Sequence, residues 1–178
     1  SPRMQPVSKT SVALKNIVAQ SCVPEPLLSR NDGQFSNLSL GHGRLAPILT
    51  CIDVCSPSCS LDLSANRISF GRTNILSELS KFESLRHLKL SSNLVGGSIR
   101  AASGIASVAA LPHLQSLCMQ NCKIGTRCVQ DIAQALKRIS HKRISFLKFL
   151  DLRGNKLNDS AAFYLSQWFS RSSSGMQD

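Results

Sequence analysis

Three cysteines at a fixed interval are the first candidates for chemistry in this chain. Cys51, Cys55 and Cys59 lie four residues apart. Zinc sites usually pair their thiolates at the closer C-x-x-C spacing, and they need a fourth ligand. Pro57 would also interrupt a helix that placed the three side chains on one face. The pattern therefore favours buried structural thiols, and we expect neither a metal nor a cofactor.

The sequence also lacks a recognisable catalytic or phosphate-binding motif. The four histidines are scattered at 42, 87, 113 and 141, outside any acyl-transfer motif. Gly96, Gly97 and Ser98 precede an expected helix, whose N-terminus could hold an anion. They lack the lysine and the spacing of a phosphate loop, so we interpret them as a flexible turn and helix cap. We predict no enzyme activity and no small-molecule ligand.

Basic residues are concentrated in one part of the chain. Nine lysines and arginines and only two aspartates lie between residues 123 and 156, a local excess of seven within the net charge of +11. Such a segment can contact an acidic protein, RNA or anionic lipid, or it can be a solvated helix face. Few aromatic side chains that stack on bases lie nearby, which favours protein over RNA. The predicted basic patch consists of Arg127, Lys137, Arg138, Lys142 and Arg143.

An eleven-residue motif, repeated along the chain, indicates which elements position these residues. Residues 85–95 read L-x-x-L-x-L-x-x-N-x-V, and residues 147–157 end in leucine instead. Residues 114–124 have cysteine in the asparagine position, and residues 58–68 begin with serine. A weaker copy at residues 35–45 would place Gly43 in the asparagine position and Ser39 at the strand centre. The predicted structural turn positions are Asn66, Asn93, Cys122 and Asn155.

Strands and helices are expected to alternate. Each motif alternates apolar and polar residues like a half-buried strand, and a stretch of helical periodicity follows it. A single strand of this length cannot bury its apolar face alone, so the copies should stack as a parallel sheet. Leu90 and Leu152 are then both expected in the dry layer between strands and helices. The longest spacing between copies indicates an insertion near residues 140–145.

Over residues 35–169 the chain resembles leucine-rich repeat proteins, most closely the ribonuclease-inhibitor-like type. The resemblance implies an α/β solenoid, a horseshoe fragment with a concave parallel sheet and helices on the convex side. It also implies protein binding through the concave face without catalytic residues. Outward strand positions on that face give the expected partner-binding residues, which are Arg86, His87, Lys89, Gln115, Gln120, Lys148, Phe149, Asp151 and Arg153.

Domain boundaries follow from the same pattern. We expect an N-terminal cap or preceding repeat at residues 1–34, about five repeats and a capping helix at 35–170, and a disordered tail at 171–178. Residues 1–24 are basic and free of acids, as a mitochondrial leader would be, although their helical apolar face favours a packed helix. No run of about 18 apolar residues occurs, so no membrane span is expected.

The predicted function is a non-catalytic protein-interaction or scaffold module, a subunit of a larger intracellular assembly. Seven cysteines without regular disulfide spacing indicate reduced thiols. We therefore expect a cytoplasmic or cytoskeleton-associated protein, with a mitochondrial location as the alternative. The alternative function is an RNA-associated structural subunit, for example of a mitochondrial ribonucleoprotein, that uses the basic 123–156 segment.

Overall fold

In the computed structural model, four strands alternate with four helices among the described residues. The structure describes residues 34–41, 45, 48–49, 60–69, 75–96, 98–140 and 147–172. In chain order the elements are β1 (Ser60–Asp62), α4 (Ile75–Leu79), β2 (His87–Lys89), α5 (Ile99–Ala109), β3 (Ser116–Cys118), α6 (Thr126–Ser140), β4 (Phe149–Asp151) and α7 (Asp159–Ser172). The predictions for residues 1–33, for the insertion, for the tail from residue 173 and for Cys51, Cys55, Cys59, Lys142 and Arg143 lie outside the described residues.

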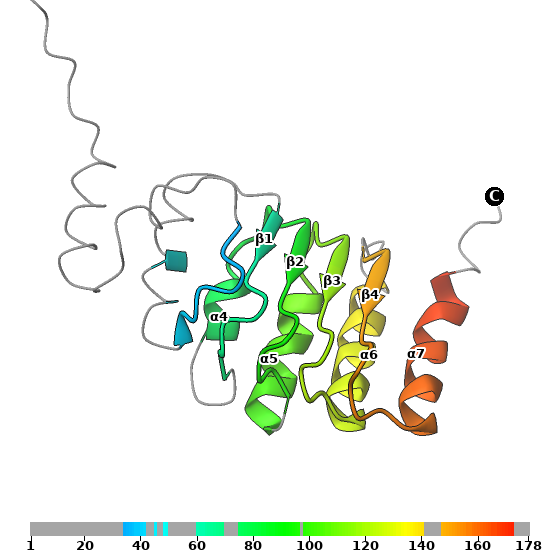
Figure 1. The fold of residues 1–178 in the computed structure, drawn as a ribbon. Helices are drawn as coiled ribbons and strands as arrows, with labels where there is room; N and C mark the ends of the chain where they lie inside the picture. The colour runs from blue at the N-terminus through cyan, green and yellow to red at the C-terminus, as the bar shows by residue number, and fades with distance from the viewer. Residues whose placement is uncertain are drawn as a thin grey trace, which may run out of the picture.

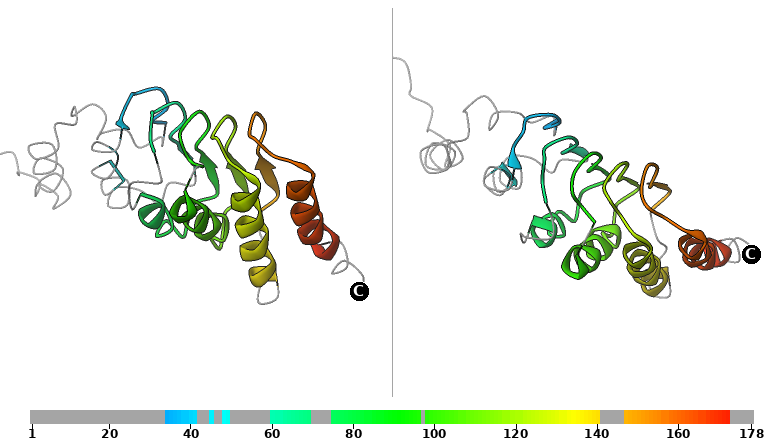
Figure 2. Two further views of the ribbon diagram at one scale, coloured as in Figure 1. Left: turned by 90° about the horizontal axis from the view of Figure 1, so that it is seen from below. Right: turned by 60° about the horizontal axis from the view of Figure 1, so that its bottom comes forward.

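The strands form one parallel sheet in the order β1-β2-β3-β4, and the helices lie along one side of it (Figure 1). Two further views show the same arrangement (Figure 2). The central leucines of the strands stand in register, and those of the first three strands are fully buried against the helices. The expected α/β repeat architecture is therefore present, because each strand buries its apolar face only beside its neighbours.

The turn before α5 contains small residues, Gly96 and Ser98, and the structure shows a reason for each. Ser98 caps the helix, since its hydroxyl accepts a hydrogen bond from the Ala101 N–H at 3.1 Å. A Cβ atom at Gly96 would collide with the backbone carbonyl of Lys123 in the next repeat. Gly96 is thus required for a close approach of two backbones, which the sequence did not indicate, and the predicted helix cap is confirmed at Ser98.

At three of the turns, an asparagine side chain joins the turn to the one before it. The Asn93 amide oxygen accepts from the N–H groups of Asn66 and Ile68, both at 3.0 Å. Its amide nitrogen donates to the carbonyls of Leu63 and Leu90 at 2.8 and 2.9 Å. Asn66 and Asn155 make the corresponding bonds, each to its own repeat and to the preceding one. Buried backbone groups that leave the sheet are satisfied in this way.

Cys122 occupies the same position with fewer bonds. Its thiol donates to the carbonyls of Leu90 and Gln120 at 3.2 and 3.3 Å. A thiol is a weak donor and a weak acceptor, so it replaces the asparagine amide only in part. Burial raises the pKa of the Cys122 thiol to about 11, against the opposing effect of the Asn93 and Ser92 backbone groups. The thiol is therefore neutral at physiological pH.

The first repeat is shifted by five residues from the predicted alignment. Gln34, and not Ser39, pairs with Asp62, the last residue of β1. The N–H groups of Leu38 and Leu40 donate to the Asn66 amide oxygen, as those of Asn66 and Ile68 donate to Asn93. Leu38 therefore takes the asparagine position that was assigned to Gly43, which itself lies outside the described residues.

Backbone conformation supports the corrected alignment. The residue before each turn position has a left-handed φ, from Asn37 at 55° and Ala65 at 56° to Gly154 at 68°. With Leu38 as the first turn position, successive turn positions are 28, 27, 29 and 33 residues apart. The repeat is more regular than the sequence motif indicated, because the first copy has Leu38 in the asparagine position and Phe35 in the position of Leu63.

The last repeat is less buried than the others. Leu150, Leu152 and Leu157 are only partly buried, whereas the equivalent residues of the β2 repeat, Leu88, Leu90 and Val95, are fully buried. The expectation that Leu152 lies in the same dry layer as Leu90 was therefore wrong. No described residue follows β4 in the sheet, so one side of these leucines remains open to solvent.

Candidate functional site

The candidate site is the face of the sheet away from the helices, which we call the open face. Strand residues on either side of the central leucines point to this face. One row across the sheet consists of Ser60, His87, Ser116 and Phe149, and a second row consists of Asp62, Lys89, Cys118 and Asp151. The side chains at the turns continue the pattern with Ser91, Gln120 and Arg153. Most of the predicted partner-binding residues thus lie on adjacent strands.

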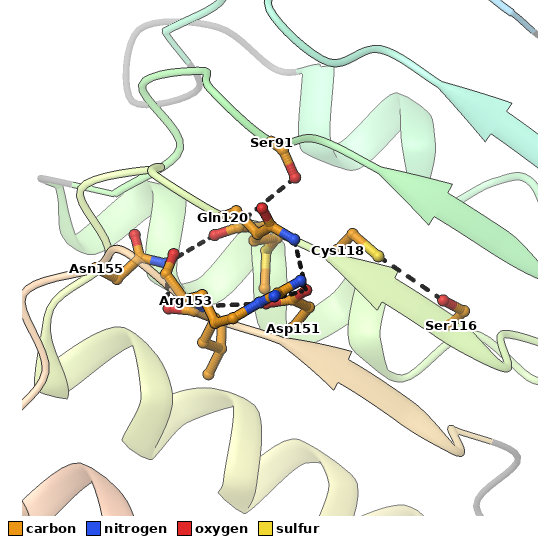
Figure 3. Close-up of polar contacts among 9 residues, drawn as sticks. Ser91, Ser116, Cys118, Gln120, Asp151, Arg153 and Asn155 are labelled. Carbon is orange, nitrogen blue, oxygen red and sulfur yellow. Dashed lines mark hydrogen bonds and ion pairs between the residues drawn. The ribbon is translucent and has the colours of Figure 1, made fainter.

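A cluster of charged and polar side chains lies at the β4 end of the open face (Figure 3). The Arg153 guanidinium donates to both Asp151 oxygens, with the shortest contact from Nη2 at 2.7 Å. The Gln120 amide donates to Asp151 Oδ2 at 2.6 Å, and the Gln120 N–H donates to the Ser91 hydroxyl at 3.2 Å. The cluster therefore joins three neighbouring repeats.

The cluster holds Arg153 in one orientation. The Asp151 side chain is 4% exposed, whereas that of Arg153 is 77% exposed. Hydrogen bonds from the Arg153 side chain hold the pKa of Asp151 well below its usual range, and they outweigh the opposing effect of burial. The Arg153 N–H and the Gln120 amide lower it further. Arg153 is thus a pre-oriented cation whose outer N–H groups remain available to a ligand.

This depressed pKa predicts a stability difference that depends on pH. Because the folded pKa of Asp151 lies below the value of about 3.9 in an unfolded chain, its stabilising effect is present above that pH. The effect is lost as the pH falls below about 3.9 towards the folded pKa. Asp151→Asn should therefore melt a few degrees below the unmodified chain at pH 6, with the gap closing towards pH 2. Melting followed by circular dichroism at both pH values tests this, and a gap that does not depend on pH would contradict it.

The open face carries an excess of positive charge. Lys89 forms an ion pair with Asp62 at 3.5 Å, which parallels the pair of Arg153 with Asp151. Arg86 and Lys148, which directly precede β2 and β4 in the chain, are also exposed. With Lys89 and Arg153 they make four described cations on or next to the strands of this face, against the two carboxylates of Asp62 and Asp151. An acidic surface would complement this distribution.

Three further predicted contact residues, Phe149, His87 and Gln115, differ in how far they are exposed. Phe149 is 51% exposed in the first row of the open face, beside Ser116 of β3. His87 is exposed two strands away in the same row. Gln115 is partly buried, and its carbonyl accepts from the N–H groups of Lys148 and Phe149. Phe149 therefore provides the apolar contact of the face, and Gln115 mainly supports β4.

The predicted basic patch is divided between different environments. Arg127 and Arg138 line a groove of about 530 Å³ between α5 and α6, beside Ala106 and Ala110. Arg127 also forms an ion pair with Asp131 at 3.4 Å. Lys137 is partly buried on the same helix. The sequence indicated the cations but missed the groove, which arises where small residues of α5 face the longer side chains of α6.

Three of the seven cysteines lie in the described part of the chain. Cys118, Cys122 and Cys128 are free thiols there, and the described residues contain no group of three potential metal ligands. Burial raises the pKa of Cys128 to about 12, with Asp131 adding to the effect. Cys118 lies on the open face, with its sulfur 3.9 Å from the Ser116 hydroxyl.

Gln120, Asp151 and Arg153 were predicted as partner-binding residues, but the contacts that join them were not predicted. Asp151 and Arg153 are two residues apart, a spacing that places both side chains on one face of a strand. That spacing alone could have predicted their ion pair. The contact of Gln120 with Asp151 spans 31 residues and depends on the pairing of β3 with β4.

Comparison with known proteins agrees with the repeat architecture. A family model described as leucine-rich repeat matches residues 144–166, which include β4 and the first half of α7. Domains of this kind generally mediate protein–protein interaction and are generally non-catalytic. No curated protein matches the chain. None of the described helices is long and apolar enough to cross a bilayer.

Proposed function

From the leucine-rich repeat at residues 144–166, we propose that the whole chain is a curved repeat array that binds a protein with an acidic surface. The open face is the binding surface and forms the concave side of the array. The ribonuclease-inhibitor-like type fits this array, since turn positions 27 to 33 residues apart leave room for the helices α4, α5 and α6 between them.

The observation that carries this proposal is the arrangement of cations on the open face. Both carboxylates of the second row are engaged by a lysine or an arginine, so neither adds free negative charge. Arg86 and Lys148 extend the positive surface at the strand starts, and Phe149 adds an exposed ring. Charged side chains around an aromatic contact suit recognition of an acidic protein and increase its rate of association.

The proposed role is that of a non-catalytic scaffold subunit within a larger intracellular assembly. Three free thiols among the described cysteines support a location in a reducing compartment, and we favour the cytoplasm. A cytoskeletal or mitochondrial location is compatible with the same argument. No described aromatic cluster that would stack on bases accompanies the cations, which is why protein is favoured over RNA.

Charge reversal on the open face tests the proposal. The variant Arg86→Glu with Lys89→Gln should lose its protein partner, whereas Lys81→Glu with Lys123→Gln should keep it. Both variants change the charge by the same amount, and all four side chains are exposed. The measurement is affinity purification with the full chain, followed by binding of the identified partner at about 150 mM salt, where charges within about 8 Å still interact.

Three results would overturn the proposal. Equal partner loss in both variants would remove the open face from the interaction. A partner surface without acidic residues would remove the electrostatic argument. RNA binding tighter than the roughly 10⁻⁴–10⁻⁶ M of non-specific contact, abolished by the open-face variant, would favour the RNA-associated alternative. Melting curves of all variants show whether each one is folded.

A further inference from the structure

The outer edge of β4 repeats a hydrogen-bonding pattern that every earlier described strand uses to bind its successor. The N–H groups of Leu63, Leu90 and Met119 donate to the carbonyls of Lys89, Cys118 and Asp151 at 2.8 to 2.9 Å. A second series runs from Ala65, Ser92 and Asn121 to the carbonyls of Ser91, Gln120 and Arg153. The equivalent donors in the last repeat are the N–H groups of Leu152 and Gly154. No described residue accepts a hydrogen bond from either of them.

The same edge exposes apolar surface. Leu150, Leu152 and Leu157 are partly buried, although their counterparts in each of the three preceding repeats are at most 1% exposed. Each of those counterparts is covered by the next repeat in the array. The β4 edge therefore combines a row of backbone donors with a row of half-covered leucines, a combination that favours pairing with another strand.

The charges at this edge indicate what kind of strand would fit. Lys148, Arg153 and Lys156 are exposed around β4. Asp151 and Asp159 are the carboxylates of the described residues 147–172, and Asp151 is already engaged by Arg153. A second copy of the same edge would bring like charges together, which opposes self-pairing. An acidic strand would meet opposite charges instead.

We propose that the β4 edge binds an extended acidic segment of a partner protein as a fifth strand. The segment accepts hydrogen bonds from the Leu152 and Gly154 N–H groups, in the register that β2, β3 and β4 use with their predecessors. Its apolar side chains alternate with carboxylates and cover Leu150 and Leu152. Its carboxylates face Lys148 and Lys156. This edge adjoins the open face proposed above and shares Lys148 with it, but it does not depend on that proposal.

A defined peptide tests the edge directly. The probe is an eight-residue peptide of alternating glutamate and valine with blocked ends, and the control is the same peptide with lysine in place of glutamate. Amide exchange of the full chain is followed by NMR. At saturating probe, exchange of the Leu152 and Gly154 amides should slow by about tenfold or more, whereas the paired amides of Leu90 and Ser92 should not change.

Matched charge variants separate the edge from general electrostatic attraction. Lys156→Glu should weaken binding of the acidic peptide about tenfold. Arg67→Glu should leave binding within about twofold, because Arg67 is exposed at the same place in the β1 turn, on the opposite side of the sheet from β4. Melting curves show that both variants are folded.

Several results would overturn this proposal. Equal binding of the lysine peptide, or binding without protection of Leu152 and Gly154, would exclude an acidic fifth strand. Equal loss of binding in both variants would place the peptide elsewhere. Protection of the same amides at high chain concentration without peptide, together with a dimer in sedimentation velocity, would assign the edge to a second copy of the chain. None of these results affects the open-face variants, so the two proposals fail separately.

Discussion

Leu90→Asp is expected to prevent folding, whereas the same change at the equivalent Leu152 should leave a folded chain. Leu90 is 0% exposed and lies in the core, directly after β2, a strand that has β1 on one side and β3 on the other. Loss of a buried leucine alone costs about 2–5 kcal/mol, and an unpaired carboxylate in its place adds several more. That sum approaches the total stability of about 5–15 kcal/mol that domains usually have. Leu152 is partly exposed at the β4 edge, so its carboxylate would remain in contact with water.

Far-UV circular dichroism and thermal melting measure the difference between the two variants. Leu90→Asp should give no cooperative transition, and Leu152→Asp should give one at a lowered temperature. Leu90→Ala serves as a control for the loss of volume without the charge. A cooperative transition near that of the unmodified chain for Leu90→Asp would show that β2 is packed differently. Equal loss of structure in both aspartate variants would show that the β4 edge is covered.

Asn93→Ala should be the most destabilising of the turn substitutions, by about 3 kcal/mol or more. Its amide group satisfies two backbone N–H groups and two buried carbonyls from two adjacent repeats. Each buried group left without a partner costs about 1–3 kcal/mol, partly recovered where water enters. Cys122→Ala removes only two weak thiol contacts, so it should cost about 1 kcal/mol.

Urea unfolding of both variants gives the two free energies on one scale. The ratio matters more than either value, because alanine replaces a buried side chain in the same turn geometry at both positions. A loss at Cys122→Ala equal to that at Asn93→Ala would mean that packing, and not hydrogen bonding, makes these positions important. A small loss at Asn93→Ala would indicate that water replaces the amide without cost.

The sequence by itself determined the repeated unit and the inner side of each strand. Leucines at alternate positions can be buried only on one face of a strand, so the register of β2, β3 and β4 follows from the motif. The helical stripes followed from periodicity in the same way, because Ile132 and Leu136 of α6 recur on one face and are fully buried. These features are local, so the sequence of one segment is enough to predict them, without knowledge of the segment that it packs against.

The first repeat required the structure, because Leu38 replaces the asparagine that marks the turn elsewhere. The motif placed Gly43 in that position, and the bonds to Asp62 and Asn66 show the alignment that the chain adopts. A one-strand sequence pattern contains no information about which neighbour it pairs with. Pairing depends on backbone groups that every residue carries, so side-chain types do not specify it uniquely.

The tertiary structure alone decided how the charged residues are used. Arg153 and Asp151 could be paired from their spacing, but Gln120 joins them only because β3 lies beside β4. Burial of Leu90 and partial exposure of Leu152 differ although their motifs are the same, since burial depends on whether another repeat follows in space. The sequence therefore determined the unit and its apolar face, and the stacking of units decided the open face, the groove and the β4 edge.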